Sequence, residues 1–512
     1  MAYKLKAGVP LPVLGLDVSK PGEFLDTRYT PDCENMELNR NIIRKRLGTT
    51  SLGSTLSDYI MAYAQLQVAQ SIYVVRQGLT KTQLLDQNAG TWGDVHHAVW
   101  TGTLADKFDF AFPVLSGVKI MVITNGVDAI RKYTGTGNTS VLGGSPPLAK
   151  YMTALKNYLL LAYIVDAGTT YTARVQWCDT GAPETWTGGN SGSVDLVEDE
   201  QDISAIAPFG DFVCVHKENS IYVGYLVTTS DVWRFDRKAT GVGTCSHMTV
   251  KNIPTGEQIF LARDGLHLFN GITAPLIRSP IMDELREEMN PAVVAKACAV
   301  IVRELDEYWV AVAIGSATDP DTVYKYNYVT GQCYKDTRTG LNVMGLYTKS
   351  SQLTWNDKTN TWDSDLTRWN DIIYSALNPT VLFGSTSGVS TIRTALYDDN
   401  AVAVSAFWTS KDFTAKELGS EEMGRLVRWT AIQVWAKGTS VILDYSIDGG
   451  TSWTNITTLT LTSAYPTDSA PLYGYFDVVA SQIRFRFRNS TSAGVFDIKK
   501  FIIEASMREV RE

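Results

Sequence analysis

The sequence predicts an all-β protein with three main parts: an extended N-terminal arm, a β-propeller of about seven blades, and a C-terminal β-sandwich. The first observation is a hairpin pattern, in which apolar residues alternate or run together over 203–215 and again over 221–226, on either side of a polar turn. The second is the return of this pattern at 259–271, and the third is a change to long alternating strands after residue 401. Such repetition indicates a series of antiparallel sheets, joined here to a different domain.

The composition is that of an ordinary globular protein. Its 512 residues exceed the length at which one hydrophobic core stops growing, so two or more domains are expected. A net charge of −8 argues against the basic surface of a dedicated nucleic-acid binder. The N-terminus lacks the apolar core of a signal peptide, and no run approaches about 18 apolar residues, so we expect neither general export nor membrane insertion. The six cysteines are far apart, which favours free, partly buried thiols in a reducing cytoplasm.

Residues 1–52 are expected to form the arm and to contribute to contacts with another domain or a neighbouring subunit. Four prolines interrupt the segment, and proline favours extended backbone and short strands over a helix. The pair Asn35 and Met36 is followed by a basic group, Arg44, Lys45 and Arg46. These basic side chains either cover a solvated strand end or contact an acidic neighbour.

Residues 53–345 are expected to form the propeller. Apolar strand pairs recur about every 45 residues, which is the length of a four-stranded blade. Seven blades fit this spacing best, with six or eight allowed because blade edges are not sharp in one sequence. Each such sheet exposes two faces, and packing around a common axis buries them. The aromatic residues Trp177, Trp186 and Trp233 are therefore expected to pack between blades rather than to stack on a ligand.

One amphipathic helix is predicted within SPIMDELREEMNP, at 279–291. Ile281, Leu285 and Met289 share one face, and Pro291 ends the pattern. The carboxylates lie mainly on the other side, where we expect them to face water.

Residues 346–400 are expected to form a connector that contains a Trp-Asp repeat. Trp355, Trp362 and Trp369 occur at intervals of seven residues, and turn residues interrupt the segment too often for a helix. Each indole is expected to tuck beneath the chain in an ordered loop. The alternative is an exposed surface that binds a sugar or a partner.

Residues 401–512 are expected to form a sandwich of two sheets, because six or more long alternating strands occur there without the blade period. The segment SIDGGTSW contains the Asp-box pattern, a hairpin turn in which the aspartate holds backbone amides and the tryptophan packs beneath. This pattern marks a fold and performs no chemistry. Its members are Ser446, Asp448, Gly450 and Trp453.

The strand IRFRFR places three arginines on one face. Arg484, Arg486 and Arg488 alternate with apolar residues that share the opposite face. The arginines either pair with local acids at a solvated face or form an interface to an acidic ring or to passing phosphates.

No catalytic, cofactor or metal site is predicted. Of the five histidines, His96 and His97 are adjacent and cannot face one metal from a regular strand, and the others are isolated. A carboxylate pair for glycan hydrolysis is assembled in space from distant strands, so spacing does not reveal it. A sialidase-like or other glycan hydrolase, or a carbohydrate-binding propeller, is therefore the alternative function.

The opening LGLDVSKPGEFLDTRYTPDCENMELNRNIIRKRLGT resembles that of the tail nozzle or tail stabilisation proteins of short-tailed bacteriophages. The likeness is carried by the Asn-Met pair, a short turn and a basic ending with Gly48, and it extends to the propeller phrases and the Trp repeat. The resemblance implies a structural virion protein, synthesised in the host bacterial cytoplasm and located in the virion tail. It implies a homo-oligomeric ring, a hexamer, below a tail adaptor protein. Such a ring forms part of the DNA exit channel, contacts the genomic DNA transiently, and holds fibres or spikes.

Overall fold

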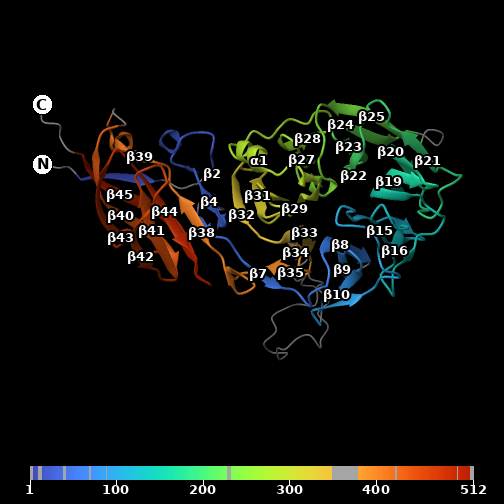
Figure 1. Cartoon of the computed structure of the whole chain (residues 1–512), viewed down its shortest axis with the longest axis horizontal. Coiled ribbons are helices and arrows are strands. Elements are labelled where there is room, and N and C mark those ends of the chain that lie inside the picture. The colour runs from blue at the N-terminus through green and yellow to red at the C-terminus, as the bar shows by residue number, and fades with distance from the viewer. Residues whose placement is uncertain are drawn as a thin grey trace, which may run out of the picture.

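The structure, a computed structural model, describes residues 4–9, 14–38, 42–68, 71–87, 89–227, 232–348, 379–420, 424–492 and 494–507. These residues form a ring of small sheets beside a two-sheet sandwich (Figure 1). No helix in these ranges is long and apolar enough to cross a membrane. The sheets confirm the all-β prediction.

The first four sheets of the ring have four antiparallel strands each, and in each sheet the first strand lies nearest the axis. A small hairpin, β13 (Val114–Leu115) with β14 (Val118–Lys119), interrupts the second. The strands are β8 (Ile60–Val68), β9 (Ser71–Gly78), β10 (Thr82–Asp86) and β11 (Thr91–Asp94); β12 (Asp109–Ala111), β15 (Met121–Thr124), β16 (Arg131–Tyr133) and β17 (Ser140–Val141); β18 (Leu148–Leu155), β19 (Tyr158–Asp166), β20 (Thr169–Trp177) and β21 (Gly192–Asp195); and β22 (Ile203–Phe209), β23 (Phe212–Lys217), β24 (Ser220–Leu226) and β25 (Trp233–Thr240).

Three further sheets complete the ring, which gives the seven blades expected from the spacing. Both hairpins of the repeated sequence pattern are present, as β23 with β24 and as β27 with β28. The strands are β26 (Lys251–Asn252), β27 (Gln258–Ala262) and β28 (Gly265–Phe269); β29 (Cys298–Val302), β30 (Glu307–Val312), β31 (Thr322–Asn327) and β32 (Cys333–Thr337); and β33 (Leu341–Tyr347), β34 (Thr380–Ser385) and β35 (Ser390–Arg393).

The arm supplies the fourth strand of the seventh blade. Strand β7 (Thr49–Ser51) pairs antiparallel with β35, while β33 packs against β8 of the first blade. The ring is thus closed by chain segments from its two ends. This blade draws on residues that the sequence analysis assigned to the arm and to the connector, so it crosses the boundaries drawn at 52 and 345. A strand of three residues has too little hydrophobic pattern to be recognised from sequence.

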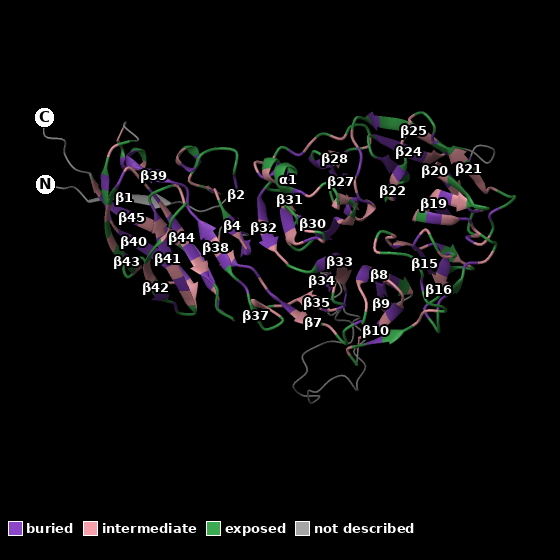
Figure 2. Cartoon of the chain, viewed as in Figure 1, coloured by how far each residue is buried: buried purple, intermediate pink, exposed green. Residues whose placement is uncertain are grey.

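Apolar clusters fill the spaces between adjacent blades. Trp177 and Trp233 lie in the cluster between the third and fourth blades, and Trp186 lies between the second and third. The expectation that these aromatic residues pack between blades is confirmed. Buried residues run along the strands of both bodies, whereas exposed residues lie mostly in the loops and outer edges (Figure 2).

The helix α1 (Met282–Glu288) follows the fifth blade and buries the face that the sequence indicates. Ile281 and Leu285 are fully buried, and Met289 is nearly so. One of its acids differs from expectation: Glu284 accepts hydrogen bonds from Lys335 Nζ at 2.5 Å and from the Tyr324 hydroxyl at 3.1 Å. The helix is therefore attached to the sixth blade by charge as well as by its apolar face.

The C-terminal sandwich also incorporates the arm. Four arm strands join its sheets, β1, β4, β5 and β6, and the core between the sheets includes Trp408, Trp429, Phe485 and Phe501. One sheet has the order β43 (Leu472–Ala480), β40 (Val427–Gly438), β45 (Phe496–Met507), β6 (Ile43–Lys45) and β5 (Met36–Glu37), with β1 (Lys4–Val9) beside β45; the other has the order β4 (Cys33–Glu34), β38 (Ala406–Thr409), β44 (Gln482–Asn489), β41 (Ser440–Ser446) and β42 (Thr454–Thr460), with β39 (Phe413–Thr414) beside β44.

The arm passes repeatedly between the two bodies. After β1 in the sandwich, β2 (Gly15–Leu16) and β3 (Tyr29–Thr30) extend the sixth blade beyond β32. The chain then returns to the sandwich and leaves it again for β7 in the seventh blade. The described part of the arm therefore contacts other domains of its own chain.

Candidate functional site

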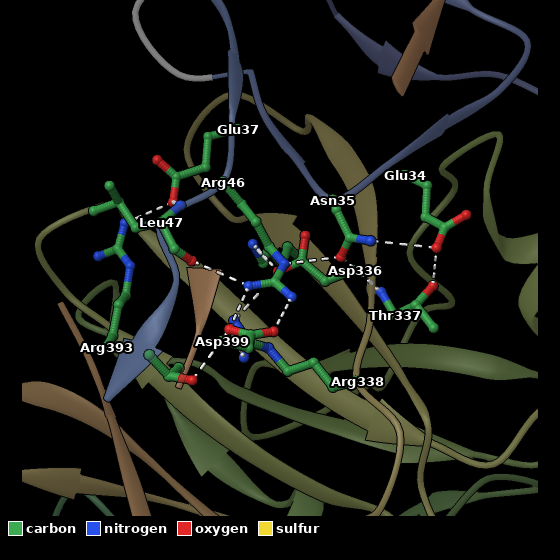
Figure 3. A network of polar contacts seen from close by, with 12 residues as sticks. Glu34, Asn35, Glu37, Arg46, Leu47, Asp336, Thr337, Arg338, Arg393 and Asp399 are labelled. Carbon is green, nitrogen blue, oxygen red and sulfur yellow. Dashed lines mark hydrogen bonds and ion pairs between the residues drawn. The ribbon is translucent and has the colours of Figure 1, made fainter. Parts of the chain in front are cut away.

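The arm, the sixth and seventh blades and the sandwich meet at one polar junction. The junction opens into a cleft of about 540 Å³ that is lined by the arm near Asn35 and Arg46, by the end of β32, by β34, and by residues 399–405 beyond the seventh blade. The short strands β36 (Asp398–Asp399) and β37 (Val402–Ala403) form part of its wall. This arrangement brings together sequence segments separated by about 350 residues, and Figure 3 shows the side chains that hold them.

Arg46 is the centre of the junction. Its side chain is almost fully buried and forms a two-pronged pair with Asp399, with Nη1 at 3.0 Å and Nη2 at 2.5 Å from the two carboxylate oxygens. Its Nε donates to Asn35 Oδ1 at 2.8 Å (Figure 3). The planar guanidinium suits this geometry because it offers several donors in fixed directions. Arg46 thus connects the arm to the segment after the seventh blade.

A second acid lies behind Arg46. Asp336 of β32 is fully buried, 3.7 Å from Arg46 Nε and 2.5 Å from Lys325 Nζ. Burial lowers the pKa of Lys325 even beside Asp336, because the low-dielectric interior disfavours its charged form. Arg338 adds a further positive charge, 3.5 Å from Asp399. The junction therefore alternates acids and bases across three chain segments.

Two acids of the junction, Asp399 and Glu37, stay ionised at neutral pH. Burial alone would raise the pKa of Asp399, but the hydrogen bond from Arg46 and the charge of Arg338 lower it to about 2. Burial likewise opposes ionisation of Glu37, yet Arg393, at 2.8 Å, lowers the pKa of Glu37 below its ordinary value. Neither acid is suited to donate a proton near neutral pH. Their ion pairs with Arg46 and Arg393 instead hold the arm against later segments of the chain.

Local backbone conformation explains two residues of the arm motif. Asn35 has a φ of 56°, a left-handed conformation that asparagine adopts more readily than most residues. Its side chain donates to the Ser405 carbonyl and accepts from the Thr337 amide. At Gly48 a Cβ atom would lie only 1.9 Å from the Asp398 carbonyl oxygen, so only glycine permits this approach.

The other arm residues singled out in the sequence are also used within the chain. Arg44 Nε donates to Asp497 Oδ1 at 2.8 Å, so it contacts an acidic neighbour from the sandwich. Lys45 is fully buried and donates to Asn489 and to the Thr491 carbonyl, and burial lowers its pKa to about 8. Met36 is buried in the sandwich core.

The arginine stripe of β44 pairs with local acids, which is the first of the two interpretations given above. Arg484 donates to Asp412 through Nε and Nη2, at 2.8 and 2.6 Å. Arg486 and Arg488 both donate to the buried Asp444. These three arginines are therefore engaged within the sandwich.

The Asp-box turn connects β41 to β42. The Asp448 carboxylate accepts from the Ser452 amide at 2.9 Å, and Ser446 Oγ accepts from the Gly450 amide at 2.8 Å. Trp453 is half-buried beneath Arg486, whose guanidinium lies 4.3 Å from the ring. Trp355, Trp362 and Trp369 lie outside the described residues.

The sequence reasoning missed the partners of the arm. Asp336, Arg338, Arg393 and Asp399 come from segments far from Arg46, and no spacing rule connects them. A buried arginine requires a buried acid, which is the one signal available in the sequence. Within the described ranges, no group of three or more His, Cys, Asp or Glu side chains is arranged to hold a metal ion.

No protein-family model matches the chain, and no curated protein matches it in sequence. Among solved structures, BamB from Moraxella catarrhalis is 12% identical with a TM-score of 0.33, and the match covers 66% of this chain and 96% of BamB. The Pan2 WD40 domain of Neurospora crassa is 7% identical with a TM-score of 0.35, and the match covers 72% of this chain and 96% of that domain. The extracellular domain of BT4673 from B. thetaiotaomicron is 9% identical with a TM-score of 0.39. The match covers 80% of this chain but only 47% of the BT4673 chain, so this chain spans about half the length of that one. Because these scores are low, the propeller assignment rests on the strand order described above.

Proposed function

We propose that this protein is a structural component of a virion tail, a nozzle subunit that assembles as a homo-oligomeric ring at the distal tail of a short-tailed bacteriophage. In this role the ring forms part of the DNA exit channel, joins a tail adaptor protein and holds fibres or spikes. The proposal starts from the resemblance of the arm motif to that family.

The observation that carries the proposal is that residues of this motif join the propeller to the sandwich. Asn35, Arg46 and Gly48 are among the residues that attach the propeller to the sandwich, through partly buried hydrogen bonds and, at Gly48, an approach too close for other residues. A ring subunit that retains DNA under load needs domains that keep a fixed relative position. Buried ion pairs are suited to specifying one geometry, since breaking such a pair leaves an uncompensated charge. The net charge of −8 also suits a channel through which a polyanion slides without adhering.

The test is the state of assembly of the purified protein and its presence in virions. Native mass spectrometry and negative-stain imaging of the full chain should show rings, with sixfold symmetry expected. Mass spectrometry of purified virions should detect the chain in tails. A protein that stays monomeric at all concentrations, with or without an adaptor-containing tail preparation, and that is absent from virions would refute the proposal.

The alternative, a glycan hydrolase or carbohydrate-binding propeller, predicts different results. It requires turnover of a saccharide or its retention on the protein. Glycan arrays and hydrolysis assays on the same preparation therefore distinguish the two functions.

A further inference from the structure

The cleft at the junction contains two charged side chains that the contacts between the domains leave unused. The cleft measures about 540 Å³, and pockets that bind small molecules range from roughly 300 to 1,000 Å³. Arg338 and Glu34 both line it, Arg338 from the turn that follows β32 and Glu34 from the arm strand β4 (Figure 3). One cleft therefore presents a base and an acid from different domains.

Arg338 is a buried base whose hydrogen-bond donors are unused. Its side chain is only 8% exposed, and among the described residues it donates no side-chain hydrogen bond. Its guanidinium lies over the ring of Phe383, 4.0 Å from the ring centre, and its Nε is enclosed without a partner. The nearest acids are Asp399, at 3.5 Å, and Asp336, at 3.9 Å, both beyond the usual N–H···O distance of about 2.7–3.2 Å.

These two acids are already engaged by other bases. Arg46 donates to both oxygens of Asp399, and Lys325 Nζ lies 2.5 Å from Asp336. Burial and the charge of Arg46 lower the pKa of Arg338 to about 10, because the two acids compensate only part of the effect of burial. A further anion beside Arg338 would therefore be stabilised.

Glu34 is the complementary acid of the cleft. Its Oε1 accepts from the Thr337 hydroxyl at 2.5 Å and from the Asn35 amide group at 3.3 Å, while its other oxygen, Oε2, points away from both donors (Figure 3). Within the described ranges Glu34 forms no ion pair, and Oε2 accepts no hydrogen bond. A cation in the cleft would therefore find an open carboxylate oxygen.

The charges of the cleft select the kind of ligand. Besides Arg338 and Glu34, the wall contains Arg46 and Asp399, which pair with each other, and hydroxyl groups of serine and threonine residues. A dianion would be attracted by Arg338 but repelled by Glu34 and Asp399. A molecule with one carboxylate and one ammonium group complements both open side chains, and a guanidinium offers parallel donors that match the two oxygens of a carboxylate.

We propose that the junction cleft binds a small zwitterionic amino acid, with its carboxylate at Arg338 and its ammonium group at Glu34. The ligand uses donors and acceptors that the ion pairs of the arm leave open, so the contacts between the domains are unchanged. The site does not depend on ring assembly, and a monomeric protein should bind the amino acid as well.

Ligand-detected NMR titrations of the full chain at pH 7 and constant ionic strength test the site. The probes are glycine, 4-aminobutanoate and 6-aminohexanoate, which differ in the distance between their two charges. Each is compared with the monocarboxylate and the monoamine of the same chain length. At least one amino acid should bind saturably and about tenfold more tightly than either of its single-charge analogues, because it forms two ion pairs instead of one.

Two variants separate the two contacts. Glu34→Gln keeps an acceptor for Thr337 but removes the charge, so it should weaken amino-acid binding about tenfold without weakening binding of the monocarboxylate. Arg338→Gln should weaken both ligands about tenfold or more. The control Arg428→Gln removes an exposed arginine that pairs with Asp477 in the sandwich, and it should bind as the unmodified protein does.

Absence of saturable binding for all three amino acids would overturn the proposal, as would a tightest amino acid that binds no better than its monocarboxylate. Unchanged amino-acid affinity in a folded Glu34→Gln protein would show that Glu34 does not receive the ammonium group. If Arg338→Gln does not fold, modification of Arg338 by phenylglyoxal in the unmodified protein decides. The bound amino acid should slow this modification, and an unchanged rate would overturn the assignment of Arg338.

Discussion

Replacing Arg46 by alanine should destabilise the protein strongly, because it leaves the buried Asp336 and the partly buried Asp399 without their shared partner. Arg46 donates to both oxygens of Asp399 and to Asn35, and it lies 3.7 Å from Asp336. Breaking a buried pair from one side costs roughly 3–5 kcal/mol. Lys325 still neutralises Asp336, and Arg338 lies 3.5 Å from Asp399, so we expect the lower end of this range, about 3 kcal/mol.

Urea denaturation followed by tryptophan fluorescence measures this loss, with limited proteolysis to report whether the arm is released. The matched control is Arg428→Ala, which breaks a pair with Asp477 of similar geometry in which both side chains are about half exposed, 53% and 56%. Water screens exposed pairs and they contribute little to stability, so this variant should unfold almost as the original does. If two transitions appear, the first is the one to compare, since the domains then unfold separately.

The double variant Arg46→Ala with Asp399→Asn tests the physical cause. If the cost comes from an unpaired buried charge, removing the acid should recover part of the stability lost in Arg46→Ala. An Arg46→Ala protein that unfolds within 1 kcal/mol of the Arg428→Ala control would refute the reasoning, because the junction would then contribute no more than a surface pair.

Three further results are expected. Gly48→Ala should destabilise the protein by about 1–3 kcal/mol and lower its melting temperature, because the added Cβ atom displaces backbone. The control Gly424→Ala should not, because its Cβ atom meets nothing within 4 Å. Equal melting temperatures for the two variants would mean that the close approach at Gly48 is absent. Because folding lowers the pKa of Asp399 from 3.8 to about 2, its ionised form stabilises the protein fully above pH 4, and this stabilisation is lost as the pH falls toward 2. The melting temperature measured from pH 5 to pH 2 should therefore fall less steeply for Asp399→Asn than for the unmodified protein. Identical slopes of melting temperature against pH would argue against this linkage. Trp429→Ala should lower the free energy of unfolding by about 3–5 kcal/mol in a denaturant titration, since this indole is fully buried. Trp453→Ala should lower it clearly less, because the indole of Trp453 is partly exposed. The reverse order would mean that the Asp-box indole is more important to the sandwich than its exposure indicates.

Much of the fold could be predicted because it depends on local patterns. The hairpin at 212–226 and its repeat at 258–269 are visible in the alternation of apolar residues, and their spacing led to seven blades. The helix face formed by Ile281 and Leu285 was predicted in the same way. Short strands such as β7 were not visible, because three residues carry no usable period.

The candidate site was predictable only in part. Asn35 and Arg46 were singled out in the motif, but the acids that meet Arg46 were not, since Asp336 and Asp399 lie about 290 and 350 residues away.

The sequence by itself determined that this chain folds into repeated small sheets followed by longer strands, because strand alternation and turn residues act over a few neighbours along the chain. Only the tertiary structure decided that the arm is threaded through both bodies and completes the seventh blade, and which acid each buried base faces. Charge pairing and ring closure depend on distance in space, and residues hundreds of positions apart approach one another only when the sheets have packed.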